Sequence, residues 1–303
     1  MTVIAIVNRK GGSGKSTLAT HVAAWLSQRG ERAMLGDVDR QQSVVQWLRR
    51  RERAAPAGEP LVGWALDPRN VLRPPVGVAH VVLDTPGGLH GLEMNRLLAH
   101  ADIVLMPLGD SIFDRESAAA CLAEMRAHPR VASARVQVAA LGMRIDAQTG
   151  GEARLAEWAA GLDLPFLGAL GDARAYVRAA ETGLTIFDLP PAEVAPDLVQ
   201  WQPVLDALVA ALAAAEAARA ADSRPMPLAA AGHPALPPAP VFRPSRPIVR
   251  ARAGNAVSAP ARPPSLQPAA AGSARLRPAE ERPALGAVVA RIKAWFVPRS
   301  LAA

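Results

Sequence analysis

Lys10-Gly11-Gly12-Ser13-Gly14-Lys15-Ser16-Thr17 is the stretch that decides the fold of this 303-residue chain. A continuous apolar run, Val3–Val7, precedes the stretch, and a helical pattern from Ser16 to Gln28 follows it. Glycines between a buried strand and a helix let backbone N–H groups close around phosphate oxygens, and the positive end of the helix adds to the attraction. The stretch therefore predicts a phosphate-binding loop.

The side chains of this loop predict ATP and Mg²⁺ as ligands. Lys15 is placed to reach the β- and γ-phosphates, and Ser16 offers a hydroxyl to the metal. The usual Walker A pattern fails by one position, because residue 9 is Arg where the first glycine would stand. The chain has three lysines among its 34 basic residues, and two of them are Lys10 and Lys15. A compact ammonium is thus retained at two positions of the loop where the larger, planar guanidinium would not fit.

The residues around the loop predict an α/β fold. Five more apolar runs are candidates for buried strands, and helical patterns separate them: Arg32–Leu35, His80–Leu83, Ile103–Leu108, Val136–Leu141 and Phe166–Leu170. This alternation predicts a doubly wound, mostly parallel sheet flanked by helices, with ligands at the carboxyl ends of the strands. A last helix is expected over Asp197–Ala220, with Trp201 in its buried stripe.

Charge and composition divide the chain near Asp222. Residues 1–221 carry 22 basic and 24 acidic side chains, a charge of −2, whereas residues 222–303 carry 12 and 3, a charge of +9. We expect an ATPase domain over residues 1–221 and a disordered Pro/Ala/Arg-rich linker over 222–283. Residues 284–297 are expected to form a short basic amphipathic helix. Attraction to nucleic acid or an anionic membrane should come mainly from this tail.

Other features favour a cytoplasmic protein. Met1–Val7 is too short for a signal peptide, and no run of eighteen apolar residues occurs. The single cysteine, Cys121, is expected to be a buried small hydrophobe.

At the phosphate loop the sequence resembles the ParA/MinD family of deviant Walker A P-loop ATPases, most closely the small ParA-type partitioning ATPases that lack an N-terminal helix-turn-helix domain. The resemblance covers most of residues 1–210. It implies that Lys10 is the signature lysine that reaches the partner subunit's phosphates in an ATP-dependent homodimer. It also implies nonspecific DNA binding and an activator of the ParB-like or cargo-adaptor type.

Two further stretches carry the resemblance at the ends of predicted strands. Gly36–Ser43 is similar to the family's Asp-x-Asp-Pro-Gln segment, with Arg40 in place of proline. The resemblance implies that Asp39 orients the attacking water and that Asp37 supports the metal shell, although two acids at a strand end could instead cap the next helix. His80–Pro86 is similar to a Walker B strand, which implies that Asp84 faces Mg²⁺. No acidic residue follows it directly, so slow hydrolysis is expected.

The last matching stretch, Asp172–Asp188, resembles the segment from which ParA proteins present arginines to DNA. It implies that Arg174 and Arg178 contact DNA phosphates, although solvated arginines on a helix face are an alternative. The run Arg49–Arg53 has a simpler explanation, since cations are favoured at a helix C-terminus.

Two functions remain open at the level of sequence. The first is a ParA-type ATPase that positions DNA or a protein cargo by binding the nucleoid. The second is a MinD-like regulator that uses residues 284–297 as a membrane anchor. The same helix could instead dock in a protein groove or fold back on the ATPase. A reductase with paired cysteines and a kinase with a tyrosine cluster are disfavoured, because the chain has one Cys and one Tyr.

Overall fold

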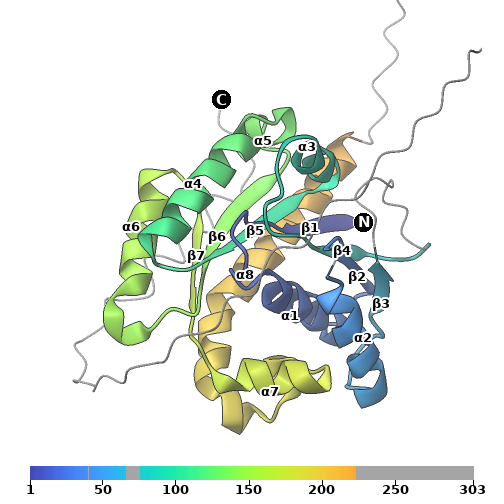
Figure 1. Ribbon diagram of the computed structural model, residues 1–303. Coiled ribbons are helices and arrows are strands. Elements are labelled where there is room, and N and C mark those ends of the chain that lie inside the picture. The colour runs from blue at the N-terminus through green and yellow to red at the C-terminus, as the bar shows by residue number, and fades with distance from the viewer. Residues whose placement is uncertain (40, 66–75, 223–303) are drawn as a thin grey trace, which may run out of the picture. The chain divides into compact units, whose positions relative to one another are not determined.

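A computed structural model describes residues 1–39, 41–65 and 76–222 of the chain (Figure 1). The linker expected over 222–283, apart from Asp222, and the helix expected over 284–297 lie outside the described residues.

A seven-stranded sheet forms the centre of the fold. Its strand order is β3-β2-β4-β1-β5-β6-β7, and every pair of neighbours is parallel. The strands are β1 (Thr2–Ile6), β2 (Ala33–Asp37), β3 (Val62–Ala65), β4 (His80–Asp84), β5 (Ile103–Leu108), β6 (Gln137–Met143) and β7 (Phe166–Leu170). All six predicted strands are confirmed, with ends that shift by one or two residues. The edge strand β3 was not predicted, because it has four residues, one of them Gly63, and an exposed Val62.

Helices cover both faces of the sheet (Figure 1). They are α1 (Lys15–Gln28), α2 (Ser43–Ala54), α3 (Gly91–His100), α4 (Ile112–Arg126), α5 (Pro129–Ala132), α6 (Gly151–Gly161), α7 (Arg174–Thr182) and α8 (Pro191–Asp222), with short 3₁₀ turns η1 (Ala147–Thr149) and η2 (Ile186–Asp188). The predicted doubly wound α/β fold is confirmed. Among the described residues no helix is both long and apolar enough to cross a membrane.

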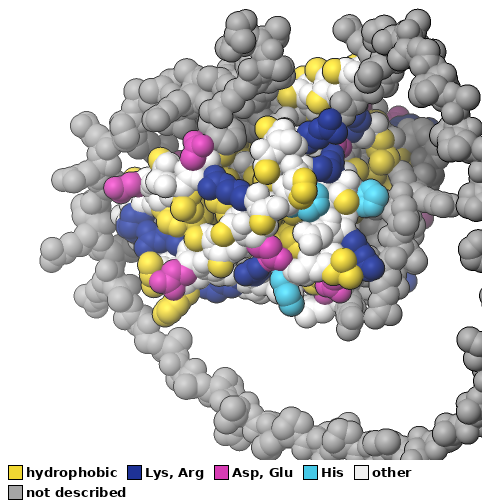
Figure 2. All heavy atoms as spheres, turned by 90° about the horizontal axis from the view of Figure 1, so that it is seen from above, with side chains coloured by type: hydrophobic (Ala, Val, Ile, Leu, Met, Phe, Trp, Pro, Cys, Tyr) yellow, Lys and Arg dark blue, Asp and Glu magenta, His cyan; other side chains and the backbone are white. Residues whose placement is uncertain are grey.

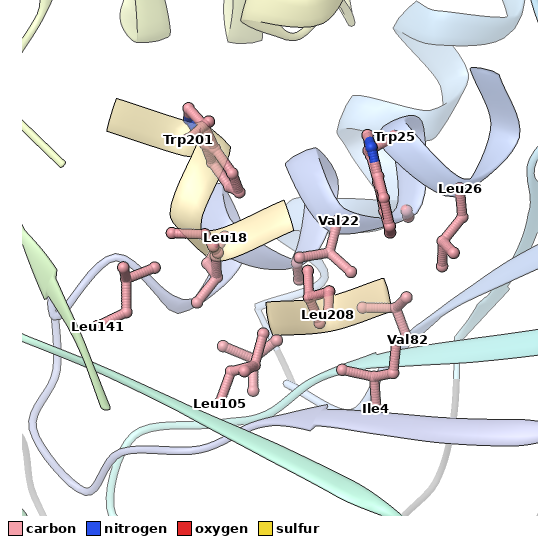
Figure 3. Close-up of a cluster of buried hydrophobic side chains, with 14 of the residues drawn as sticks. Ile4, Leu18, Val22, Trp25, Leu26, Val82, Leu105, Leu141, Trp201 and Leu208 are labelled. Carbon is pink, nitrogen blue, oxygen red and sulfur yellow. The ribbon is translucent and has the colours of Figure 1, made fainter. Parts of the chain in front are cut away.

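Alternation along the strands divides the core into two clusters. In β1, Ile4 and Ile6 belong to one cluster and Val3 and Ala5 to the other, because successive side chains point to opposite faces. Figure 3 shows the first cluster, in which side chains of α1 and α8 pack over strand residues such as Ile4. Trp201 is fully buried there, as predicted.

The amino edge of the sheet brings the two ends of the domain together. Arg219, near the end of α8, donates hydrogen bonds to the Met1 carbonyl, the Thr2 hydroxyl and Asp102, the last at 3.0 Å. Thr2 begins β1 and Asp102 directly precedes β5. The end of α8 is therefore fixed at the edge of the sheet opposite to the phosphate loop, which follows the carboxyl end of β1.

Candidate nucleotide-binding site

The glycines of the loop between β1 and α1 adopt conformations that other residues avoid. Gly12 and Gly14 have φ of 71° and 93°. A Cβ at Gly14 would lie 2.8 Å from the Cε of Met143, whereas a Cβ at Gly11 would meet no atom within 4 Å. The loop is fixed from below by the buried Asn8, whose Nδ2 donates to the Pro107 carbonyl (2.6 Å) and whose Oδ1 accepts from the Lys10 amide (3.1 Å).

Lys15 lies inside this loop. Its side chain is buried and donates from Nζ to the carbonyl of Lys10 at 3.0 Å. Burial lowers the pKa of Lys15, although Asp84 and Asp39 oppose the shift. A desolvated ammonium in a glycine-rich loop at the start of a helix is an anion-binding arrangement. The phosphate-binding role of Lys15 stays a prediction.

A hydroxyl and a carboxylate meet at the carboxyl end of β4. Ser16 donates from Oγ to Oδ2 of Asp84 at 2.6 Å. Asp84 is buried, and burial raises its pKa to about 7. Its Oδ1 has no hydrogen-bond partner among the described residues. A buried, unpartnered carboxylate oxygen beside a serine hydroxyl fits Mg²⁺, which takes one or two protein oxygens and completes its shell with phosphate and water.

Asp37 caps the next helix, as one of the two sequence interpretations proposed. Its Oδ2 accepts from the amides of Val44 (3.0 Å) and Val45 (3.1 Å), and its Oδ1 accepts from the amide of Asp39 (3.1 Å). Asp37 also pairs with Asp84 in the register of β2 and β4, so the two carboxylates are neighbours on the same edge. The metal role of Asp37 stays a prediction.

Asp39 lies beyond the end of β2 and is half-buried. Its Oδ1 accepts from the amide of Gln41 at 3.0 Å, and its charge reaches Lys15. The structure thus places Asp39 on the nucleotide side of the sheet, and its role toward water stays a prediction.

The signature lysine has a partner within its own chain. Nζ of Lys10 forms an ion pair with Oδ1 of Asp114, in the first turn of α4, at 2.8 Å. Burial works against ionisation of Asp114, but hydrogen bonds from Lys10 and Ser111 outweigh it and lower the pKa of that carboxyl. Sequence reasoning missed Asp114. Its signal was the Ser111-x-x-Asp114 pattern that opens a helix directly after a buried strand.

A hollow of about 650 Å³ lies beside the loop. Gly14 and Thr17 form the side toward the loop, and Arg50 of α2 lies on another side. The carboxyl ends of β6 and β7, the residues after them and one face of α7 form the rest: Met143, Arg144, Leu170, Gly171, Asp172, Ala173, Tyr176, Val177, Ala180 and Glu181. The volume is in the range of small-molecule sites. The hollow can hold the remainder of a ligand whose phosphates occupy the loop.

The predicted DNA segment forms α7 and η2 and is attached to the nucleotide helix. The buried His21 of α1 accepts at Nε2 from the amide of Ile186 (3.3 Å), and its Nδ1 lies 2.7 Å from the carbonyl of Thr17. Its ring stacks on Trp201 with centroids 5.4 Å apart. Arg174 and Arg178 are both exposed on α7.

The arginine run of α2 is divided by the fold. Arg51 is buried and forms an ion pair with Asp188 of η2 at 2.7 Å, whereas Arg49 and Arg53 are exposed. The preference of cations for a helix C-terminus therefore explains only part of this arginine run, because the buried Arg51 has a specific partner. Figure 2 shows another part of the surface, seen from above, where basic, acidic and apolar side chains are interspersed.

Comparison with known proteins identifies the domain. A family model described as the CobQ/CobB/MinD/ParA nucleotide binding domain matches residues 4–213. Maintenance of carboxysome distribution protein A of Gloeobacter kilaueensis is 31% identical over 156 residues, which are 48% of this chain and 68% of that protein. Chromosome-partitioning ATPase Soj of Thermus thermophilus is 32% identical over 152 residues, with 40% of this chain and 60% of that protein covered.

Solved structures share the fold at lower identity. An ATP complex of a Cyanothece McdA variant superposes with a TM-score of 0.52 at 14% identity and covers 67% of this chain and 96% of that one. The MinC:MinD cell division protein complex of Aquifex aeolicus gives a TM-score of 0.51 at 16% identity, with 75% and 98% covered.

Proposed function

This chain belongs to the CobQ/CobB/MinD/ParA nucleotide-binding family, and we propose that it is an ATP-dependent dimerising switch that positions DNA or a protein cargo in a bacterial cell. The observation that carries the proposal is the meeting of three groups at one loop. Lys15 supplies a buried cation, Ser16 a hydroxyl, and Asp84 a carboxylate oxygen without a partner among the described residues. Together these groups match the requirements of a nucleoside triphosphate with Mg²⁺.

Each residue then has a separate task. Lys15 binds the β- and γ-phosphates, and the amides of the loop orient them. Ser16 and Asp84 would hold Mg²⁺, which would neutralise charge on the phosphate oxygens. Asp37 fixes the start of α2 and so places Asp39, which orients the attacking water. Because no acidic residue directly follows Asp84, hydrolysis is slow until an activator binds.

A positioning role is supported by the relatives, whose names refer to carboxysome distribution and chromosome partitioning. In this proposal ATP drives dimerisation, the dimer binds nucleoid DNA nonspecifically through Arg174 and Arg178, and a ParB-like or cargo-adaptor partner triggers hydrolysis. The protein is then cytoplasmic and nucleoid-associated. A MinD-like membrane role through residues 284–297 is the alternative, supported by the +9 charge of residues 222–303.

The two lysines of the loop separate binding from switching. Lys15→Ala should abolish ATP binding, because the phosphates lose their buried charge partner. Lys10→Ala should keep measurable ATP binding but lose ATP-dependent dimerisation and hydrolysis, since Lys10 acts toward the second subunit. Equilibrium nucleotide binding and sedimentation measure both, and Lys293→Ala, which removes the third lysine, serves as the control. Normal dimerisation of Lys10→Ala would contradict the cross-subunit role.

Asp39→Ala tests the water-orienting carboxylate. The variant should keep ATP and accumulate as a long-lived dimer, because phosphate and metal contacts are intact while the chemical step is slow. Hydrolysis at the wild-type rate would remove Asp39 from the mechanism.

A further inference from the structure

Three contacts tie the phosphate loop, the loop that follows Asp84 and helix α4 to one another. Glu124 of α4 forms an ion pair through Oε2 with the guanidinium of Arg9. Its other oxygen, Oε1, accepts from the amide of Gly91 at 2.6 Å. The amide of Gly88 donates to the carbonyl of Arg9 at 2.7 Å. The contacts close a ring in which Arg9 and Glu124 each hold one end of residues 88–91.

The segment between β4 and α3 contains two glycines that allow it to lie against the phosphate loop. A Cβ at Gly87 would lie 3.4 Å from the Cα of Gly11, so the chain passes directly against the phosphate loop. Gly88 has φ of 79°, a region that glycine enters without strain. These two glycines therefore suit the close approach.

Glu124 also satisfies the start of a helix. Gly91 is the first residue of α3, and the side chain of its N-cap residue, His90, accepts no hydrogen bond from the amides at that end. The first amides of a helix need acceptors and attract negative charge. Glu124 supplies both from another helix, and Arg9 then balances its charge. Residues 85–91 are thus held at three points, because the Thr85 hydroxyl also donates to the Ile6 carbonyl at 2.7 Å.

The Arg9–Glu124 ion pair is partly exposed, so its main role is not to stabilise the fold. The side chains of Arg9 and Glu124 are 31% and 23% exposed, and pairs of this kind contribute little to folding. What the pair does define is the position of residues 85–91, which begin directly after the Asp84 carboxylate and lie against Gly11.

We propose that Glu124 is a positioning residue that holds residues 85–91 against the phosphate loop and, through Arg9, sets the rate of hydrolysis. The inference rests on the proposed ATPase function. A segment that follows Asp84 and is already held against the phosphate loop needs little rearrangement as the reaction proceeds, which raises kcat without raising affinity for ATP.

Amide hydrogen exchange on the nucleotide-free full chain tests the clamp directly. In Glu124→Ala, amides of residues 87–92 should exchange at least 10-fold faster than in the wild type, while amides of α1 keep their rates. Glu124→Gln should give an intermediate effect, since its amide oxygen still accepts from Gly91. Glu116→Ala, on the same helix and exposed, is the matched control.

Steady-state ATP hydrolysis tests the consequence. Glu124→Ala and Arg9→Gln should each lower kcat at least 10-fold and leave KM within threefold. Arg9→Gln changes the ring without altering α4, so it tests the proposal even if Glu124→Ala folds poorly. Unchanged exchange at residues 87–92 overturns the clamp, and so does a KM that rises as much as kcat falls. A wild type that binds no ATP would instead contradict the proposed function, and the exchange result would stand separately.

Discussion

Single glycines of the phosphate loop differ in what they tolerate. Gly14→Ala should lower the free energy of unfolding by about 1–2 kcal/mol, because the residue has φ of 93° and its new Cβ would press on Met143. Gly11→Ala is the matched control, since its Cβ enters open space, and should cost less than about 1 kcal/mol. Urea unfolding measures both. Equal losses in the two variants would show that neither conformation nor contact controls this loop.

His21 makes stability depend on pH. Burial lowers the pKa of His21 to about 4 from its ordinary 6.5. The unfolded chain therefore takes up a proton below pH 6.5 that the folded chain refuses until about pH 4, and stability falls as the pH drops through this window. The loss is on the order of 3 kcal/mol. His21→Gln should lack this component in urea unfolding between pH 7 and 4.5, and His100→Gln, on the surface of α3, should retain it.

If His21→Gln keeps the full pH dependence of the free energy of unfolding, the titration belongs to another group. The nearby charges are Asp188, which favours the protonated ring, and Arg51, which opposes it.

At the scale of elements, a buried ion pair joins α2 to η2. Arg51→Met should destabilise the domain by about 3 kcal/mol, because Asp188 would stay buried without its cation. Arg53→Met, on the exposed face of the same helix, should change the free energy of unfolding by less than about 0.5 kcal/mol. Chemical denaturation compares them. Similar values for the two variants would mean that Asp188 is satisfied by its hydrogen bonds from Thr185 and Gln28.

Elements whose signal is local were predictable from the sequence. β1 and β5 are continuous apolar runs, and the loop before α1 has its glycines at fixed spacing, so the fold and the position of Lys15 followed from them. β3 carries no such signal. Asp114 and Glu124 were missed for another reason. Each contacts the phosphate loop across more than a hundred residues, and only the packing of α4 on the sheet brings them there.

Asp37 lies between features that the local sequence predicts and features that depend on packing. Its position after β2 was evident, yet the sequence could not decide between a metal ligand and a helix cap. The three backbone amides at its carboxylate depend on how the chain turns into α2.

At the scale of the whole molecule, DNA binding should depend on charge at α7. Arg174→Glu combined with Arg178→Glu should weaken binding of the ATP-bound protein to DNA of any sequence. It should also reduce the salt dependence by about two ions per protomer, because in the proposed complex each arginine contacts one phosphate. Fluorescence anisotropy over a salt series measures this, with Arg96→Glu on α3 as the control. Unchanged affinity would move the DNA site to the arginines of residues 222–303.

The tail should be separable from the ATPase. Truncation after Asp222 keeps α8 and the contacts of Arg219, so ATP binding and basal hydrolysis should stay near wild type. Val289→Glu combined with Ile292→Glu should reproduce the truncation in localisation. Flotation with anionic vesicles then separates the alternatives: binding that the Glu variant loses supports a membrane role, and no binding by wild type favours a protein groove. Loss of ATPase activity on truncation would contradict an independent tail.

The contacts of Arg219 hold both ends of the domain on the side of the sheet opposite to the phosphate loop. Met1 and the end of α8 meet at the amino edge of the sheet, while the phosphate loop opens at the carboxyl edge. A short peptide that joins residue 222 to residue 1 would thus permit circular permutation, with new ends cut in a surface loop. It also follows that a fluorescent protein fused before Met1 would lie on the side away from the phosphate loop and would leave that loop clear for the second subunit of the proposed dimer.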